Sequence, residues 1–128
     1  MEILRKCSRC DETACTMEEL EEKFSKRKNR PLGYDYMCKK CNSNRKSAKF
    51  FGITIEEYKE AMSTSSYCEI CGSTKDLCYD HNHDTGDFRG VLCNHCNRSL
   101  GGFMDSEELL LKAIDYLKER GTYDRTKN

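Results

Sequence analysis

The sequence has little of what a large apolar core requires. Its 128 residues include no Trp and one Pro, and 34% of them are Asp, Glu, Lys or Arg. This composition excludes a large hydrophobic core, and small domains without one usually need disulfides or metal ions for stability. No apolar run approaches the roughly 20 residues that a membrane-spanning helix needs. We therefore expect no association with a membrane.

The first ten residues, MEILRKCSRC, also lack the features of a secretory signal peptide. They contain neither a long apolar stretch nor a small-residue cleavage site. We therefore expect a cytoplasmic protein. In such a reducing compartment, cysteines are more often metal ligands than partners in disulfides.

Cysteine, by contrast, is abundant and regularly spaced. The ten Cys include four Cys-x-x-Cys pairs, whereas random placement would give about 0.8 of them. Pairs grouped two and two are typical of zinc sites with four thiolate ligands. A disulfide scaffold is the less favoured alternative. We predict two structural zinc ions, the first bound by Cys7, Cys10, Cys38 and Cys41 and the second by Cys68, Cys71, Cys93 and Cys96.

The formal net charge is zero, but the charges are unevenly distributed. Ten Lys and Arg residues and a single acid, Asp35, lie between Lys23 and Lys49. A basic segment in a neutral protein is typical of a surface that contacts a nucleic-acid backbone, although a solvated loop has the same composition. The residues that we predict to contact DNA in this segment are Lys39, Lys40, Arg45 and Lys46.

Apolar periodicity and capping residues predict the main elements of secondary structure. They are helices over 16–28, 53–66 and 105–121, a short helix from Asn97, and strands over 77–81 and 88–92. Asp105 would cap the last helix, and its apolar stripe would pack over the zinc module. The Asp84-Thr85-Gly86 sequence between the two strands indicates a hairpin turn. The polar residues 42–52 are expected to form a linker or a DNA-facing edge.

The hairpin and the following helix contain the residues best suited to catalysis. A zinc ion with four thiolate ligands has no open position for substrate, so it would fix the hairpin rather than catalyse. Asp80 and Asn97 offer hard oxygen ligands, which suit Mg²⁺. Histidine, with an unperturbed pKa of about 6.5, accepts protons near neutral pH, and His81 directly follows Asp80. The alternative is that these are ordinary polar residues of a hairpin turn.

Residues 79–101, YDHNHDTGDFRGVLCNHCNRSLG, resemble the phage recombination endonuclease VII family, a branch of the His-Asn-His or ββα-metal nucleases. The resemblance extends from about Tyr67 to Leu117. It implies that Asp80 and Asn97 bind Mg²⁺, with Mn²⁺ as a substitute, and that His81 is the general base. The second cysteine group matches the structural zinc site of the family. His83 would either orient the phosphate or pack, and Arg89 would contact a phosphate or form an ion pair.

Together, these observations predict a small, zinc-stabilised α+β protein in three parts. Residues 1–52 would form a basic, zinc-ribbon-like module, 53–66 a linking helix, and 67–128 a nuclease domain with a ββα-metal hairpin and helix and a C-terminal helix. If the chain comes from a phage, the compartment is the cytoplasm of the host cell.

The expected function is a metal-dependent DNA endonuclease, with branched or recombination DNA as one substrate option. The first alternative is a zinc-dependent DNA-binding module without catalytic activity. The second is a cross-braced zinc module for protein interaction, in which the first and third cysteine pairs would share one ion. The oligomeric state is left open, with a dimer as one option.

Overall fold

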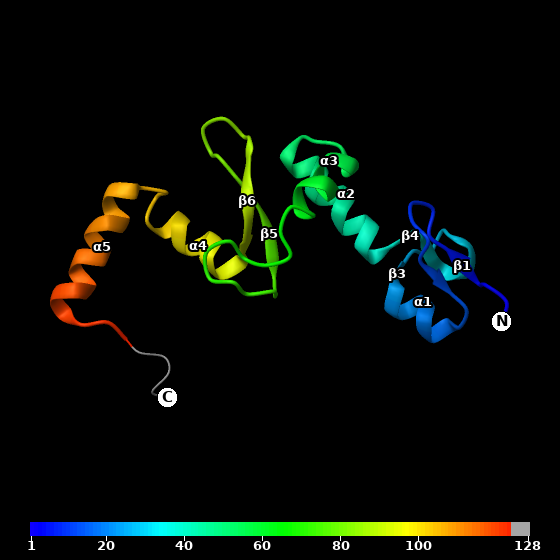
Figure 1. Ribbon diagram of the computed structural model, residues 1–128. Helices are drawn as coiled ribbons and strands as arrows, with labels where there is room; N and C mark the ends of the chain where they lie inside the picture. Colours follow the sequence, from blue (N-terminus) through cyan, green and yellow to red (C-terminus); the bar gives the residue numbers. More distant parts are fainter. Residues whose placement is uncertain (124–128) are drawn as a thin grey trace. The chain divides into compact units, whose positions relative to one another are not determined.

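The computed structural model describes residues 1–123 and divides into two compact units, Met1–Ala61 and Met62–Asn128 (Figure 1). Each unit is built on short antiparallel strand pairs and helices. Among the described residues, no helix has the length and apolar character that crossing a membrane demands. The predicted small, zinc-stabilised α+β fold class is confirmed, and the three-part division of the chain stays a prediction.

The first unit contains two hairpins and three α-helices. In chain order these are β1 (Arg5–Lys6), β2 (Thr13–Ala14), α1 (Met17–Lys23), β3 (Phe24–Lys26), the short 3-10 helix η1 (Pro31–Gly33), β4 (Tyr34–Cys38), α2 (Lys39–Phe51) and α3 (Ile55–Met62). Strand β1 pairs with β2, and β3 pairs with β4. The buried core joins Leu20, Phe24 and Tyr34 to three of the cysteines.

Helix α1 is shorter than the helix predicted over residues 16–28. Its start is as expected, because the Thr16 hydroxyl accepts a hydrogen bond from the Glu19 N–H at 3.1 Å. The predicted end is wrong, since the chain leaves the helix at Phe24 and continues as β3. Phe24 is 1% exposed and pairs with Cys38 across the hairpin, so a long-range strand partner overrides the local helical pattern.

Helix α2 occupies most of the segment that was expected to be a linker or edge. It begins where β4 ends, because the Cys38 sulfur caps the helix by accepting a hydrogen bond from the Cys41 N–H at 3.5 Å. It ends at Gly52, which adopts a left-handed conformation with φ 70°. The polar surface of this helix gives little apolar periodicity, which is why the sequence pattern did not indicate it.

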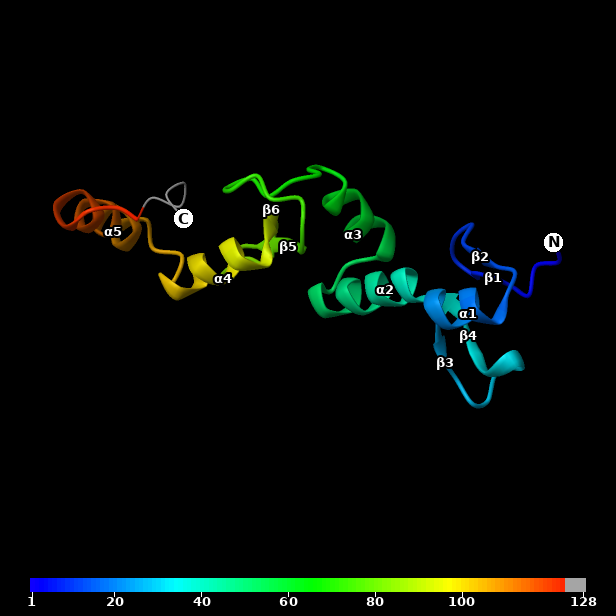
Figure 2. The same cartoon turned by 90° about the horizontal axis from the view of Figure 1, so that it is seen from below.

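The second unit contains one hairpin followed by two helices. These are β5 (Leu77–His81), β6 (Phe88–Cys93), α4 (Asn94–Gly102) and α5 (Glu107–Arg120), and Figure 2 shows α4 continuing directly from β6. The hairpin is as predicted, with Leu77 opposite Cys93 and Asp80 opposite Gly90. Its turn is closed by Asn82, whose side-chain oxygen accepts hydrogen bonds from two backbone N–H groups of the turn.

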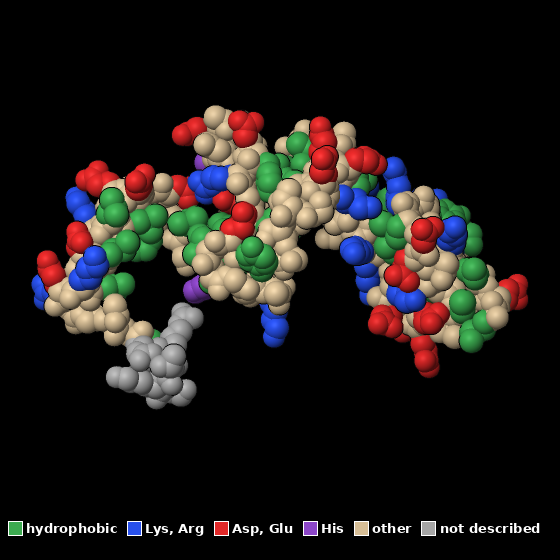
Figure 3. Space-filling view, viewed as in Figure 1, with side chains coloured by type: hydrophobic (Ala, Val, Ile, Leu, Met, Phe, Trp, Pro, Cys, Tyr) green, Lys and Arg blue, Asp and Glu red, His purple; other side chains and the backbone are tan. Residues whose placement is uncertain are grey.

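Both helices of this unit begin at different residues from those predicted. Helix α4 begins at Asn94 rather than at Asn97, because the Cys93 sulfur caps it through the Cys96 N–H at 3.4 Å. Helix α5 is capped by the Ser106 hydroxyl rather than by Asp105. The apolar stripe of α5 was expected to pack over the zinc module, but none of its residues is buried: Leu109, Leu110 and Ala113 are half-buried, and Ile114 and Leu117 are exposed. Apolar surface is visible on this helix in Figure 3.

Two clusters of four thiols lie at corresponding places in the two units. Each set of four sulfur atoms lies within 4.8 Å of one another, and the sets are the two predicted from the Cys-x-x-Cys spacing. The Cys10 and Cys38 sulfurs are 3.8 Å apart, and those of Cys71 and Cys93 are 3.6 Å apart. Tetrahedral zinc with Zn–S bonds of about 2.3 Å places its sulfurs roughly 3.8 Å apart, so both sites fit zinc. The pairing is sequential, which contradicts the cross-braced alternative.

One thiol in each cluster is prepared to ionise before the others. Burial raises the pKa of Cys7, but hydrogen bonds from the backbone N–H groups of Cys38 and Arg9 outweigh it and lower the pKa to about 6. Cys68 also has its pKa lowered to about 6, since backbone N–H groups again outweigh burial. Burial and neighbouring thiols raise the pKa of Cys96 to about 12. Metal binding must therefore release protons from the less acidic thiols.

The two units share one architecture beyond their cysteine clusters. In each, a Cys-x-x-Cys loop precedes a hairpin, and the second strand ends on a cysteine that caps a helix. The residue after the last cysteine of each cluster is an asparagine, Asn42 in α2 and Asn97 in α4. The two units thus share a strand pair that leads into a cysteine-capped helix, whereas in the first unit α1 lies between the Cys-x-x-Cys loop and that pair.

Replacing Cys41 by Ser should remove one of two metal ions per chain and unfold the first unit. The small core of that unit contains three of the four thiols, so it cannot persist without the bound ion. Metal content measured by mass spectrometry and thermal unfolding would test this. The matched control is Cys15→Ser, which lies outside both clusters and should retain two ions. Two tightly bound ions in Cys41→Ser would contradict the assignment.

Candidate active site

The centre of the candidate site is an ion pair between the two strands of the second hairpin. Asp80 lies near the end of β5 and is 4% exposed. Its carboxylate accepts two hydrogen bonds from Arg89 of β6, from Nε at 2.7 Å and from Nη2 at 3.2 Å. This two-point geometry is the strong form of a carboxylate–guanidinium contact. Of the two roles predicted for Arg89, the structure therefore shows the ion pair.

A second carboxylate reaches the same guanidinium from the turn between α4 and α5. Asp105 Oδ2 lies 3.4 Å from Arg89 Nη1 and 3.8 Å from Nε2 of His83. Asp105 adopts a left-handed conformation with φ 52°, and its N–H donates to the Leu100 carbonyl at 2.9 Å. The hydrogen bond to Asp80, followed by the contact with Asp105, raises the pKa of Arg89. Arg89 is therefore a cation held between two carboxylates.

Asp105 was missed as a site residue because the sequence pattern assigned it a capping role. An acid directly before a strong helix is typical of an N-cap, and that local explanation was sufficient. No local pattern in the sequence places Asp105 beside Arg89, because the contact joins residues 16 positions apart in the chain.

His81 and His83 lie together at the tip of β5. Their ring centroids are 4.7 Å apart, with His81 half-buried and His83 exposed. Neighbouring residues of a regular strand point to opposite faces, which would separate His81 from Asp80. The register of the hairpin, however, shifts between these two residues, and such an irregularity redirects a side chain.

Asn97 lies in the first turn of α4 and is half-buried. Helix α4 packs against both β5 and β6, so the capping cysteine brings Asn97 to the helix end that adjoins the hairpin. Among the described residues, no hydrogen bond joins its side chain to Asp80. The structure thus links Asp80, Arg89, His83 and Asp105 by direct contacts and places Asn97 on the adjoining helix.

The donor atoms present suit a hard divalent cation. The buried Asp80 carboxylate is already satisfied by a cation, the Arg89 guanidinium, and the Asn97 amide adds a second hard oxygen. A hollow of about 480 Å³ is lined by His83, Arg89 and Asp105 among others, but Asp80, His81 and Asn97 do not contribute to its lining. A metal ion at Asp80 would compete with the guanidinium for the carboxylate or share it, since the two oxygens offer about four acceptor sites.

The predicted DNA contacts of the basic segment lie elsewhere, on the exposed surface of α2. Lys39, Lys40, Arg45 and Lys46 are all exposed. Lys39 donates to the Glu21 carbonyl at 2.9 Å, and Arg45 donates to Asn42 at 2.9 Å. They belong to the first unit, whereas Arg89 belongs to the second.

A family model decides the identity of the second unit. Residues 43–119, more than half of the chain, match the model of recombination endonuclease VII. The chain belongs to the recombination endonuclease VII family. The family predicted from residues 79–101 is therefore confirmed, and the matched segment includes Asp80, His81, Arg89 and Asn97. The first cysteine cluster lies outside the matched segment.

Relatives within this family include two phage proteins. The Gene 59 protein of Mycobacterium phage D29 is 44% identical over 75 residues, which cover 54% of this chain and 46% of that protein. The Gene 59 protein of Mycobacterium phage L5 is 41% identical over 73 residues, covering 52% and 44%. The matched part of the chain spans slightly less than half the length of these relatives.

Among solved structures, the chain is similar to the crystal structure of the ββα-Me type II restriction endonuclease Hpy99I. The identity is 28% and the TM-score is 0.45, over 94% of this chain and 72% of that one.

Replacing Arg89 by Met should destabilise the second unit by about 1–3 kcal/mol, because the buried Asp80 carboxylate loses its counter-ion. The loss of stability is moderate because the Arg89 side chain is 37% exposed, so water partly screens the ion pair. Adding Asp80→Asn to this variant should recover most of the loss, since a neutral amide needs no counter-ion. Chemical denaturation without added Mg²⁺ measures both effects.

The control for this experiment is Arg98→Met, which removes an exposed arginine from α4 and should change stability by less than about 0.5 kcal/mol. A double variant no more stable than Arg89→Met alone would show that the ion pair is unimportant for folding.

Proposed function

We propose that this chain is a divalent-metal-dependent DNA endonuclease whose active site lies in the second unit. The observation that carries the proposal is the buried Asp80 carboxylate beside His81, on a hairpin joined to a four-thiol cluster. Membership of the recombination endonuclease VII family supports the same activity. A general base such as the one proposed at His81 is needed for hydrolysis and not for DNA binding alone.

In this proposal, Asp80 and Asn97 hold Mg²⁺, or Mn²⁺ in its place. The ion would supply positive charge to the phosphate and to the departing 3′ oxygen. His81 takes the proton of the attacking water, which is the role of a general base. His83, whose ring lies beside that of His81 and near Asp105, orients the phosphate.

Arg89 has two successive roles in the same proposal. Before the metal binds, it neutralises Asp80 and so makes the burial of that carboxylate tolerable. Once Asp80 is engaged, Arg89 stays tethered to Asp105 and its other N–H groups can reach a phosphate oxygen. Both predicted roles of Arg89 then belong to one catalytic cycle.

The ions in the two cysteine clusters are proposed to be zinc with a structural role. Four thiolates fill a tetrahedral coordination sphere and leave no position for water or substrate. Since the relatives named above are phage proteins, we further propose that the chain acts on DNA in the host-cell cytoplasm. Branched or recombination DNA is the substrate option that the family name favours.

One observation favours the second candidate, a DNA-binding module without catalytic activity. The Asp80–Arg89 pair satisfies the buried carboxylate without any metal ion. If the guanidinium were never displaced, the site would be purely structural. The two candidates therefore differ in whether a divalent cation competes with Arg89.

His81→Ala should reduce cleavage by at least about 100-fold, because a general base contributes about 10²–10⁴-fold to a rate. The assay is nicking of supercoiled plasmid with Mg²⁺. Zinc content and DNA affinity should stay unchanged, since His81 belongs to neither cysteine cluster. The control is His95→Ala, an exposed histidine on α4, which should retain activity. If His81→Ala cleaved plasmid as fast as the unmodified protein, His81 would not be the general base. If the unmodified protein cleaved with none of the divalent metals tested, the DNA-binding module would be favoured.

Mg²⁺ should stabilise Arg89→Met more than it stabilises the wild-type protein. In the wild type the ion shares the Asp80 carboxylate with a guanidinium whose positive charge opposes binding, whereas in the variant the carboxylate has no counter-ion. Thermal unfolding at several Mg²⁺ concentrations measures the difference. The double variant Asp80→Asn/Arg89→Met should lose the response. Equal shifts in all three proteins would place the metal away from Asp80.

A further inference from the structure

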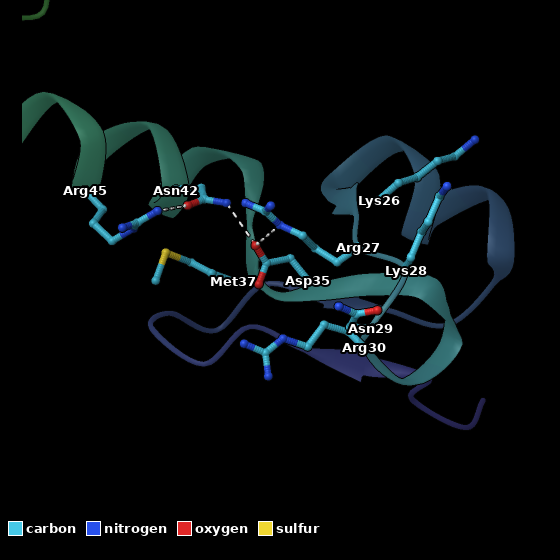
Figure 4. A pocket seen from close by; sticks show the side chains of 9 residues that line it. All are labelled: Lys26, Arg27, Lys28, Asn29, Arg30, Asp35, Met37, Asn42 and Arg45. Carbon is cyan, nitrogen blue, oxygen red and sulfur yellow. Dashed lines mark hydrogen bonds and ion pairs between the residues drawn. The ribbon is translucent and has the colours of Figure 1, made fainter.

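The first unit contains a basic hollow at the end of its second hairpin. It measures about 710 Å³ and is lined by Lys26, Arg27, Lys28, Asn29, Arg30, Asp35, Met37, Asn42 and Arg45 (Figure 4). Five of these side chains are cationic, and Asp35 is the single acid. The hollow therefore has a strongly positive potential although the whole chain has no net charge.

The hollow adjoins the strand pair that leads into α2, and the candidate active site lies on the strand pair that leads into α4. Arg27 stands three residues after Phe24, which pairs with the cysteine that caps α2. Asp80 likewise stands three residues after Leu77, which pairs with the cysteine that caps α4. The asparagine after the last cysteine is retained in both units. At the same distance along the chain, the first unit has a guanidinium just beyond β3 and the second a carboxylate within β5, although the β3–β4 register shifts between Phe24 and Lys26.

The first unit also contains an ion pair across its second hairpin, but there the cation comes first in the chain and the acid second. Arg27 of the loop after β3 donates to Asp35 of β4 at 3.4 Å, whereas Asp80 of β5 accepts from Arg89 of β6. The Asn42 amide N–H₂ also donates to Asp35, at 3.1 Å, and its oxygen accepts from Arg45 at 2.9 Å. The Asp35 carboxylate and the Asn42 amide oxygen, two hard oxygens of this hollow, are thus engaged by N–H donors, as the dashed lines of Figure 4 show.

The rim of the hollow is an ordered loop. Arg5 is 7% exposed and donates to the backbone carbonyls of Pro31, Tyr34 and Asp35. The Arg27 N–H donates to the Gly33 carbonyl at 2.8 Å and closes the loop. The guanidinium of Arg30 lies 4.9 Å from the centre of the Tyr36 ring. The cations on this loop are therefore partly held in place before any ligand binds.

Two of the cations remain available to an anion. Within the described part of the chain, no acid forms an ion pair with Lys28, and none does with Arg30, whose stacked guanidinium retains its N–H groups. Lys26, by contrast, pairs with Glu21 at 3.3 Å. Available N–H donors in a hollow without a free carboxylate suit a phosphate group.

We propose that this hollow is a non-catalytic site for a backbone phosphate of DNA. The chain would then bind DNA at two sites of related architecture. In the second unit a carboxylate holds the metal ion that acts on the scissile phosphate. In the first unit a guanidinium contacts a phosphate that is not cleaved. The choice of DNA as the source of the phosphate rests on the proposed endonuclease function. The anion preference of the hollow rests only on its own residues.

The test is the double variant Lys28→Gln/Arg30→Gln, with both substitutions in exposed side chains. Binding of a labelled DNA duplex is measured by fluorescence anisotropy at several salt concentrations, without added Mg²⁺ so that no cleavage occurs. The expected result is a loss of affinity of about 5–20-fold at 0.1 M salt. The slope of log affinity against log salt should fall by about 1–2, as expected for one or two lost phosphate contacts.

Two matched variants separate the hollow from charge in general. Lys6→Gln/Lys59→Gln removes the same charge from exposed positions of the first unit outside the hollow, and it should bind DNA nearly as well as the wild type. Lys28→Arg/Arg30→Lys keeps the charge and should retain most of the affinity. Metal content and thermal unfolding confirm that each variant is folded.

The outcomes distinguish this proposal from the proposed function. Equal DNA affinity of Lys28→Gln/Arg30→Gln and Lys6→Gln/Lys59→Gln would overturn the phosphate site, even if the wild-type protein cleaves plasmid. A specific loss of affinity would support the site, even if no cleavage is seen. A second experiment measures binding of inorganic phosphate to the hollow by ³¹P line broadening. If the hollow binds phosphate but DNA affinity does not change in Lys28→Gln/Arg30→Gln, DNA is not the source of the phosphate.

Discussion

The structure depends on one repeated interaction, the closure of four thiols around the start of a helix. In each unit a cysteine at the end of the second strand caps the helix through its sulfur and also belongs to the cluster. The cluster therefore fixes a loop, a hairpin and a helix at a single point. The apolar core around it is small, and in the second unit Leu92 is the one buried non-cysteine residue of the main cluster. Metal binding thus supplies what burial of apolar surface cannot.

The two hairpins that lead into the cysteine-capped helices carry ion pairs with opposite order of charge. Asp80 with Arg89 presents a buried carboxylate whose counter-ion can be displaced by a cation. Arg27 with Asp35 presents a guanidinium, and the neighbouring Asn42 amide donates a hydrogen bond to the Asp35 carboxylate. In the two proposals, this difference in side-chain charge directs a metal ion to the second unit and an anion to the first.

The Asp80–Arg89 pair also sets a condition on the candidate active site. A buried carboxylate without a counter-ion costs several kcal/mol, so the guanidinium stabilises the fold in the absence of metal. In the proposed mechanism, the same contact competes with the metal ion for the carboxylate. Asp105, in the turn after α4, gives Arg89 a second partner to retain when Asp80 is engaged. Stability and metal affinity are therefore coupled through a single side chain.

The sequence by itself determined the two cysteine clusters, the α+β class, the second hairpin and the family, because spacing along the chain and a contiguous motif carry them. It also indicated Asp80, His81 and Asn97 as candidates, whose roles stay predictions. Only the tertiary structure decided that α1 ends at Lys23, that residues 39–51 are helical and that Asp105 joins Arg89. These features depend on partners many residues away, such as the strand opposite Phe24 and the carboxylate opposite Arg89. Local patterns report a residue's neighbours in sequence, whereas strand pairing, ion pairs and the basic hollow form between segments that meet only in the fold.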